Sequence, residues 1–437
     1  MTDVRSSAAS SASAGQAYRA LAILSIAWVL AYLDRQIIAL LIPSLKHDLL
    51  LTDVQVSLLQ GVAFAAFFTL AGLPIGRLVD RHNRRNIAVF GVLCWSAMTM
   101  ACGFARSFEA LFVGRMFVGV GEACLAPAAV SIVADYFAPE RRGRAIGTML
   151  MGGAIGTGAS ALLGGAAMAR FAAGGTGLFT GFAAWQLTFL AVGAPGIVVA
   201  LLLLMIHEPA RQQSPTGVSA ASSDGLNATV RERWRLLLPL YIAFGGNMVA
   251  SFGGGAWMPT MLMRDFAMSP ARVGLIFGTL LLANGLIAPM LGGWASDAAA
   301  QRDPKRGRLY LALGLFALQF LSAAAMPLLR GFHATLATLA LTMFAASCLA
   351  ASAMVVLQDV VPANVRGRVI VIYLMIANIV GMGLGPLFVA LLTDHLFANE
   401  GMVRDSIAMT VVITAMIGCL ATRFAISAGE TPQPPAR

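Results

Sequence analysis

Four ionisable side chains lie inside apolar stretches of the sequence, where charges are rare. Asp34 and Arg35 are adjacent in the stretch from 20 to 45, and Arg115 and Glu122 lie in the stretch from 109 to 137. A charge at the centre of a bilayer costs roughly 2.5 to 3.5 kcal/mol on insertion scales, so such residues normally face a bundle interior or a water-filled cavity. The sequence therefore predicts an intramembrane site built from two acids and two bases.

Proton binding is the chemistry that these four residues favour. Desolvation makes an acid hold its proton, whereas a nearby guanidinium favours the ionised form. Because arginine stays charged, it can act as a movable counter-ion. We expect Glu122, which has no arginine next to it in the sequence, to carry the proton. Asp34 would be its coupled partner, and Arg35 and Arg115 would be charge partners.

Two static readings of the same residues stay open. Arg115 and Glu122 lie about two helical turns apart and share a face of one helix, so they could form an ion pair that only fixes helix register. All four charges could also form a static network that never moves a proton.

The elements that position these residues follow from the composition. The chain has 437 residues, of which 58% are hydrophobic and only 11% are charged; soluble domains carry roughly 25% charged residues. Twelve apolar stretches are long enough to span a bilayer. The fold class predicted is therefore all-α: a polytopic membrane protein of twelve transmembrane helices in two six-helix halves.

The boundaries predicted are a disordered cytoplasmic tail (1–18), two halves (19–207 and 234–426), a cytoplasmic linker (208–233) and a second tail (427–437). With both termini cytoplasmic, the cytoplasmic side holds roughly three times as many Lys and Arg residues as the other side. We therefore expect a multi-pass plasma (inner) membrane protein with both termini inside. The net charge of +10 then faces the lipid bilayer and not nucleic acid. We expect a monomer.

The two halves repeat one another. GRLVDRHNRR (76–85) corresponds to GGWASDAAAQRDPKRGR (292–308), and DYFAPERRGRAI (135–146) corresponds to DVVPANVRGRVI (359–370). Parallel repeats of this kind are typical of transporter halves that are related by an axis along the membrane normal. The five cysteines all lie in apolar stretches without CxxC spacing or a neighbouring histidine, so we expect no metal site and no cofactor other than protons.

Two motifs resemble those of the major facilitator superfamily. Gly76, Leu78, Asp80, Arg81, Arg84 and Arg85 match its Gly-x-Leu-x-Asp-Arg-x-x-Arg-Arg pattern, with Asn83 where glycine is usual, and Arg115, Gly119 and Gly121 match its Arg-x-x-x-Gly-x-Gly pattern. YLDRQ (32–36), GVGEA (119–123) and RRGRAIG (141–147) are most similar to the bacterial spinster-like transporters, although anion:cation symporters for sugar acids share similar stretches. The resemblance implies twelve helices, alternating access and proton coupling.

A cytoplasmic gate is expected around the first motif. We expect Asp80 to hold the two halves together by accepting from an arginine and from the N-terminus of a neighbouring helix. The gate residues predicted are Gly76, Asp80, Arg81, Arg84, Arg85, Asp135 and Arg144. Solvated topogenic charge is the alternative reading, and it applies above all to Arg84 and Arg85.

The substrate cavity predicted is charged on the N-terminal side and apolar on the C-terminal side, where the helices carry amides and hydroxyls but no central charge. Its predicted lining residues are Tyr32, Phe64, Phe67, Asn247, Trp257, Asn284, Gln319, Tyr373 and Asn378. An amphiphile would fit such a division.

The function predicted is therefore that of a proton-coupled secondary active transporter of an amphiphilic, lysolipid-like or sphingoid-like molecule. A transporter of a small organic anion such as a sugar acid and a drug exporter are the alternatives, together with a non-transporting receptor. We do not expect an enzyme or a nucleotide-driven pump, because HExxH, GxSxG and nucleotide-binding motifs are absent from the sequence.

Overall fold

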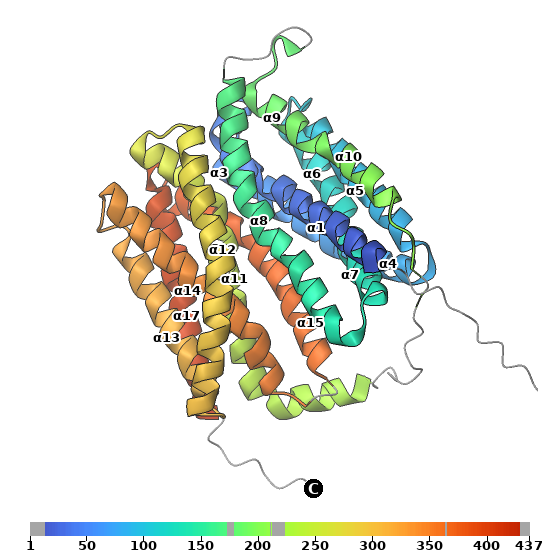
Figure 1. Cartoon of the computed structure of the whole chain (residues 1–437). Coiled ribbons are helices and arrows are strands. Elements are labelled where there is room, and N and C mark those ends of the chain that lie inside the picture. Colours follow the sequence, from blue (N-terminus) through green and yellow to red (C-terminus); the bar gives the residue numbers. More distant parts are fainter. Residues whose placement is uncertain (1–13, 173–178, 210, 212–222, 363–364, 429–437) are drawn as a thin grey trace, which may run out of the picture.

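Apolar helices long enough to cross a membrane make up the molecule. A computed structural model describes residues 14–172, 179–209, 211, 223–362 and 365–428, and every regular element in this part of the chain is a helix (Figure 1). Twelve candidate membrane spans are present among the described residues. The prediction of an all-α fold with twelve transmembrane helices is confirmed.

The N-terminal half contains six spans, several of which are divided into shorter helices. These are α1 (Ala14–Gln36) with α2 (Ile38–Leu49); α3 (Asp53–Ser57) and the π-helical turn η1 (Leu58–Val62) with α4 (Ala63–Arg81); α5 (Arg84–Cys102); α6 (Phe108–Glu122) with α7 (Leu125–Tyr136); α8 (Pro139–Phe171); and α9 (Ala184–Gly193) with α10 (Pro195–Leu204).

The C-terminal half contains the other six spans. These are α11 (Ser223–Phe266); α12 (Pro270–Arg302); α13 (Gly307–Ala325); α14 (Phe332–Asp359); α15 (Arg366–Ile376) with the π-helical turn η3 (Ala377–Leu384), α16 (Gly385–Leu391) and η4 (Leu392–Leu396); and α17 (Val403–Ala428), which follows the short turn η5 (Glu400–Met402).

One expected helix is interrupted at the charged site. The stretch from 109 to 137 reads as a single helix in the sequence, but the structure ends α6 at Glu122 and begins α7 at Leu125. Pro127 lies in the first turn of α7, and proline has no N–H and its ring clashes with the carbonyl four residues earlier, here that of Ala123. The interruption therefore follows from Pro127 and places Glu122 at a helix end.

Two tail and linker boundaries differ from those predicted. Residues 14–18 belong to α1, whereas 1–13 and 429–437 lie outside the described residues. Residues 223–233, predicted as linker, are helical and lead into α11 through a non-helical residue at Arg233 (φ −114°, ψ 15°). Residues 210 and 212–222 of the linker lie outside the described part.

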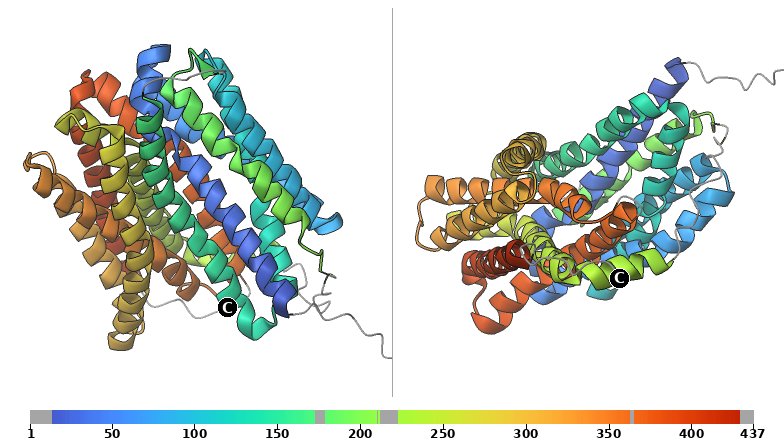
Figure 2. Two further views of the ribbon diagram at one scale, coloured as in Figure 1. Left: turned by 45° about the horizontal axis from the view of Figure 1, so that its top comes forward. Right: turned by 90° about the horizontal axis from the view of Figure 1, so that it is seen from below.

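The two halves separate toward one end of the bundle. We call the end at which α1 begins and α17 ends the terminal face, and the other end the opposite face. Figure 1 shows α8 and α12 close together near the opposite face and far apart at the terminal face, and Figure 2 shows the same divergence from other directions.

Glycines record this separation at atomic scale. Near the opposite face, a Cβ on Gly165 would lie 2.6 Å from the Pro270 carbonyl oxygen, and one on Gly61 would lie 2.5 Å from that of Gly383. Near the terminal face, a Cβ on Gly72 or Gly147 would meet no atom within 4 Å. The halves therefore contact one another near the opposite face and are open toward the terminal face.

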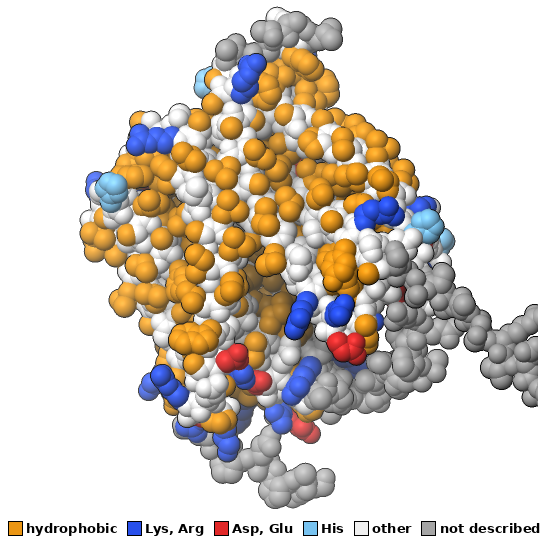
Figure 3. Space-filling model, viewed as in Figure 1, with side chains coloured by type: hydrophobic (Ala, Val, Ile, Leu, Met, Phe, Trp, Pro, Cys, Tyr) orange, Lys and Arg blue, Asp and Glu red, His pale blue; other side chains and the backbone are white. Residues whose placement is uncertain are grey.

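The surface has the polarity expected of a membrane protein. Orange apolar side chains cover the middle of the face shown in Figure 3, and Lys and Arg side chains gather at its lower end, where the terminal face lies. The interior contains several buried apolar clusters. One of them joins both halves through residues such as Ile37 and Trp257, and another lies within the C-terminal half.

Candidate transport site and gates

The charged site lies where α1 and α6 both end. Arg35 donates to Glu122 Oε2 from Nε at 3.1 Å and from Nη2 at 2.6 Å, so the ion pair joins two different spans. The Glu122 side chain is 1% exposed and that of Arg35 is 12% exposed. The alternative reading in which Arg115 forms the ion pair with Glu122 does not describe this structure, because a shared helix face does not fix where a long side chain reaches.

Arg115 contacts the interrupted first span. Its Nη2 donates to the backbone carbonyl of Arg35 at 3.3 Å, next to the break between α1 and α2. Arg115 is fully buried, and its Nε and Nη1 have no hydrogen-bond partner in the described structure. A buried guanidinium with two free donor groups can bind an anionic or carbonyl oxygen.

Asp34 bonds to a residue outside the ion pair. The Thr99 hydroxyl of α5 donates to Asp34 Oδ2 at 2.6 Å, and Asp34 Oδ1 has no partner among the described residues. Asp34 is 1% exposed and lies within electrostatic reach of Glu122, Arg115 and Arg35. Of the two buried acids at this site, Asp34 is thus the one without a direct guanidinium contact. Thr99 was missed by the sequence reasoning because no charge marks it.

Aromatic rings enclose the Arg35 guanidinium. Its Cζ lies 4.8 Å from the ring centroid of Tyr32, 4.6 Å from that of Phe64 and 5.2 Å from that of Phe68. Tyr32, Phe64 and Phe68 therefore lie beside the charged site, whereas Phe67 is not among these rings; that Tyr32, Phe64 and Phe67 line the substrate cavity stays a prediction. Phe64 and Phe68 are four residues apart on α4 and stack on each other, and this helical spacing could have identified Phe68.

Two of the amides predicted in the C-terminal half line a separate cavity of about 180 Å³. Asn284 and Gln319 line it, and Asn247 is buried behind it, where it bonds to Gln319. The remaining three predicted residues do not line this cavity. Trp257 is fully buried and donates to Ser57 Oγ and the Pro386 carbonyl, Tyr373 is buried in an apolar cluster, and Asn378 donates to the Leu374 carbonyl of its own span.

The predicted gate residues lie near the ends of helices and not in a loop. Gly76, Asp80 and Arg81 belong to the last turns of α4, and Arg84 and Arg85 begin α5. Asp80 is exposed and makes no recorded side-chain contact in the described structure. Arg144 is exposed as well, and Asp135 pairs with Arg84. The latch across the halves would require a closed terminal face, and it stays a prediction.

Arg84 is the centre of the contacts that do form at the terminal face. It is 2% exposed, pairs with Asp135 of α7, and donates from Nε to Glu208 Oε1 at 2.7 Å and from Nη1 to Ser131 Oγ at 3.0 Å. The Glu208 carboxylate also accepts from the backbone N–H groups of Arg84 and Arg85 at the start of α5, where a negative charge is favoured. Arg84, Ser131 and Asp135 belong to the N-terminal half, and Glu208 follows directly after its last span.

The C-terminal half repeats the central pair. Arg308 at the start of α13 pairs with Asp359 at the end of α14, and both this pair and Arg84–Asp135 span 51 positions of sequence. Arg308 also lies 3.5 Å from Asp297, the counterpart of Asp80. The internal repeat of the sequence therefore appears as one ion pair in each half.

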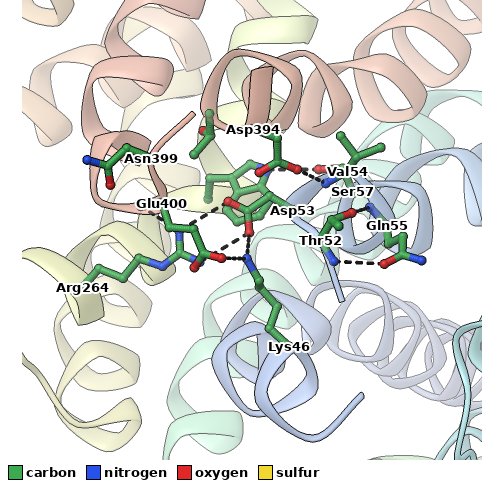
Figure 4. A network of polar contacts seen from close by, with 12 residues as sticks. Lys46, Thr52, Asp53, Val54, Gln55, Ser57, Arg264, Asp394, Asn399 and Glu400 are labelled. Carbon is green, nitrogen blue, oxygen red and sulfur yellow. Dashed lines mark hydrogen bonds and ion pairs between the residues drawn. The ribbon is translucent and has the colours of Figure 1, made fainter. Parts of the chain in front are cut away.

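A network of charges at the opposite face joins the two halves (Figure 4). Asp53 at the start of α3 pairs with Lys46 of α2 and lies 3.4 Å from Arg264 of α11. Glu400 completes the network, at 2.8 Å from Lys46 and 3.1 Å from Arg264. Asp53 is fully buried, whereas the Glu400 side chain is 63% exposed.

Further contacts next to this network seal the opposite face. The Ser57 hydroxyl of α3 donates to the Pro386 carbonyl of α16 at 2.9 Å, and the Val54 N–H donates to Asp394 at 3.0 Å. Sequence reasoning missed the whole network, because Asp53 and Arg264 are separated by 211 positions and each alone looks like an ordinary loop charge.

Comparisons with known proteins place this architecture in a family. The family model described as Major Facilitator Superfamily matches residues 24–386 and 240–433. Among curated proteins, an MFS-type efflux pump of Mycolicibacterium smegmatis is 26% identical over 92% of this chain and 90% of that protein. Protein spinster homolog 3 of Mus musculus is 27% identical over 88% of this chain and 76% of its own length. The match to protein spinster homolog 1 of Xenopus laevis spans 56% of that protein.

A solved structure supports the same assignment. The crystal structure of a bacterial homolog of the human lysosomal transporter Spinster, in an inward-facing and unoccupied conformation, superposes with a TM-score of 0.80 at 26% identity and covers 97% of this chain and 100% of that chain. A D-xylose–proton symporter shares the fold alone, with a TM-score of 0.66 at 15% identity. The chain belongs to the major facilitator superfamily and is a transporter of the spinster type, not an enzyme.

Proposed function

We propose that this protein is a proton-coupled transporter that moves an amphiphile with an anionic headgroup, lysolipid-like or sphingoid-like, by alternating access. The observation that carries the proposal is Arg115, a fully buried guanidinium with two unpartnered donor groups beside the Arg35–Glu122 pair. A phosphate or carboxylate of the substrate would accept from these donors. The apolar cavity of the C-terminal half supports an amphiphile, because it offers space for an apolar body close to the charged site.

Competition for Arg35 would couple the anion to a proton. In this structure Glu122 occupies the Arg35 guanidinium. When the anionic group of a substrate takes that place, the buried Glu122 carboxylate loses its counter-charge, and neutralisation by a proton becomes favourable. Anion and proton would then bind together. Asp34, held by Thr99 and with one free oxygen, is the proposed coupled partner of Glu122.

Two further substrate classes have support of their own. A probable L-galactonate transporter of Escherichia coli is 26% identical over 63% of this chain, which favours a small organic anion as the second candidate. The mycobacterial efflux pump favours an exported drug as the third. Both would use the same arginines for an acidic group, and they differ in what fills the C-terminal cavity.

Glu122→Gln tests the proton role, because glutamine keeps the shape of glutamate but cannot ionise. Proteoliposomes would be loaded with a fluorescent lysophosphatidylglycerol or, in a second arm, with L-galactonate. We expect counterflow at equal pH to survive and accumulation driven by a pH gradient to disappear. Glu109→Gln on the same helix is the matched control, since Glu109 is exposed in the first turn of α6.

The two possible failures are distinguishable. Full gradient-driven uptake by Glu122→Gln would remove Glu122 as the proton carrier. Loss of both counterflow and gradient-driven uptake would assign Glu122 to substrate binding or structure instead. Asp34→Asn should impair coupling less cleanly, because it also replaces the charged acceptor of the Thr99 hydroxyl with a weaker neutral one.

We also propose that the terminal face is cytoplasmic, so that both termini lie inside. The excess of Lys and Arg at this face supports the orientation. Reporter fusions after Arg437 and within the 208–233 linker should both report the cytoplasm. A periplasmic signal from the linker would contradict the six-plus-six arrangement in this orientation.

A further inference from the structure

A small cavity in the C-terminal half is chemically one-sided. It lies between α11, α12, α13 and α14, and Gln36, the residue after Arg35, forms part of its wall. Its apolar lining includes Phe252, Met258, Leu281 and Met343. The volume of about 180 Å³ suits one end of a molecule and not a whole drug-sized ligand. No Asp, Glu, Lys or Arg is among the described residues that line it.

A chain of hydrogen bonds fixes how one amide faces this cavity. The Ala346 backbone carbonyl can only accept, so the Asn247 group 3.0 Å from it must be the donating Nδ2. Asn247 Oδ1 then accepts from Gln319 Nε2 at 3.2 Å. Gln319 Oε1 is thereby turned away from Asn247. Gln319 is 1% exposed, and this oxygen has no partner in the described structure.

Among the buried side-chain atoms of the described wall, only acceptors lack a partner. The Ser251 hydroxyl donates to the backbone carbonyl of Asn247, and the Thr342 hydroxyl donates to the backbone carbonyl of Thr338. Among the described lining residues, the buried side-chain atoms without a partner are Gln319 Oε1 and Asn284 Oδ1. The Asn284 amide is less constrained, because the Ser347 hydroxyl that it contacts can donate or accept. Gln319 is therefore the lining residue whose free acceptor has a fixed orientation.

A ligand with a hydrogen-bond donor would satisfy this buried acceptor. Leaving such a group unsatisfied costs about 1 to 3 kcal/mol. An ammonium group could donate, but it would lose its hydration in a cavity whose described lining contains no acid. A neutral hydroxyl can donate to Gln319 Oε1 without bringing a charge into the cavity.

We propose that this cavity holds the uncharged end of the substrate and selects a hydroxyl group there through Gln319 Oε1, with Asn247 as the positioning residue. This inference rests on the proposed function and narrows its substrate class. The substrate would carry an acidic group for Arg115 and Arg35 at one end and a hydroxyl on an apolar body at the other.

The test uses a pair of probes that differ only in the ability to donate. Cyclohexanol has a hydroxyl hydrogen, and cyclohexyl methyl ether does not. Binding of each would be measured on the purified full-length protein in nanodiscs, and the ratio of the two affinities would be compared between variants. Partition of the probes into lipid cancels in this comparison, because it is the same for every variant.

We expect the protein to bind the alcohol about three- to tenfold more tightly than the ether, the range expected for one net hydrogen bond. Gln319→Leu should remove this preference and lower the ratio of the two affinities to the value that partition of the probes into lipid alone would give. Gln60→Leu is the matched control, because it makes the same change at a buried glutamine on η1, which does not line the cavity. An unchanged ratio in Gln319→Leu would overturn the proposal.

A second variant closes the cavity without touching the amides. A Cβ added to Gly255 of α11 meets no atom within 4 Å, and Gly255 lines the cavity, so Gly255→Leu should fill the space. We expect it to weaken binding of both probes. Gly293→Leu on α12 is the control, since Gly293 has equal clearance but does not line the cavity. Strong binding of both probes by Gly255→Leu would also overturn the proposal, because the probes would then bind elsewhere.

This measurement stays separate from proton coupling. The probes carry no charge, and no pH gradient is applied. The alcohol preference should be the same in Glu122→Gln as in the unaltered protein. Gradient-driven uptake by Glu122→Gln together with an intact alcohol preference would therefore contradict the proposed coupling alone. If the unaltered protein shows no preference for the alcohol over the ether, the Gln319 site alone is contradicted.

Discussion

In the described part of the chain, ion pairs at one end of the bundle join the two halves, whereas those at the other end do not. At the opposite face, Asp53 of the N-terminal half binds Arg264 of the C-terminal half, so the network bridges the halves. At the terminal face, Arg84 binds Asp135 of its own half and Glu208, which directly follows the last span of that half, and Arg308 binds Asp359 of its own half. Ion pairs of similar chemistry therefore have different consequences, because only pairs between halves change when the halves move.

This difference separates stability from conformation. Rocking of one half against the other must break the Asp53 network, so its energy enters the balance between states. The same motion leaves Arg84 and its partners together, so their energy contributes to the stability of both states alike. We therefore expect substitutions at the two faces to be read out by different measurements.

The largest expected effect is on stability, at Arg84. Arg84→Met would leave the carboxylates of Asp135 and Glu208 without their shared cation, and we expect unfolding to become easier by about 2 to 3 kcal/mol. The midpoint of thermal unfolding of the purified protein would measure this loss. Arg141→Met is the control, because Arg141 is exposed at the start of α8. A changed distance between spin labels on the two halves would contradict the assignment to one half.

The next effect is on conformation, at Asp53. Asp53→Asn would remove the buried negative charge between Lys46 and Arg264, and we expect it to favour opening of the opposite face by about 1.5 kcal/mol, a little over tenfold. Spin-label distances across the opposite face would report the shift. Glu400→Gln should change the distribution much less, because the exposed side chain is already solvated. Equal effects of the two variants would show that burial of Asp53 is irrelevant.

A smaller effect on the same balance is expected at Gly61. A Cβ there would lie 2.5 Å from the Gly383 carbonyl oxygen, a backbone atom that cannot move aside cheaply, so Gly61→Ala should disfavour closure of the opposite face by about 1 kcal/mol. Cysteine accessibility near Ser57 would report the opening. Gly72→Ala in the same span has free space and should leave accessibility unchanged. The same accessibility in both variants would contradict the role of this close approach.

The sequence was informative about what lies within one span and uninformative about what lies between spans. Twelve spans follow from apolar length alone, and Asp34, Arg35, Arg115 and Glu122 meet in one place because charges inside a bilayer must be compensated. Their pairing did not follow, since the adjacent Asp34 and Arg35 point to different partners, Thr99 and Glu122. The Asp53 network was invisible for a related reason: each member lies at a helix end, where a charge needs no explanation.

The prediction of Asp80 as the residue that holds the two halves together has the same limit, because a sequence pattern does not show which residues meet between spans. Within the motif from 76 to 85, sequence pattern alone could not rank Asp80 against Arg84, because both are charged residues at a helix end. The structure buries Arg84, which binds Glu208 and Asp135, and leaves Asp80 exposed without a hydrogen bond or ion pair in the described part of the chain.

The smallest effect, and the sharpest one for the comparison, is expected at Asp80. In a state that is open at the terminal face, Asp80→Asn should change the unfolding free energy by less than about 0.5 kcal/mol, the usual limit for exposed sites. If Asp80 latches the halves when the terminal face closes, the variant should nevertheless lower the share of the closed state in spin-label distances across that face. Arg84→Met should show the reverse pattern, with a large loss of stability and an unchanged distribution. A loss of stability in Asp80→Asn equal to that of Arg84→Met would mean that Asp80 belongs to the contacts within one half, and an unchanged distribution would leave Asp80 with a role in topology alone.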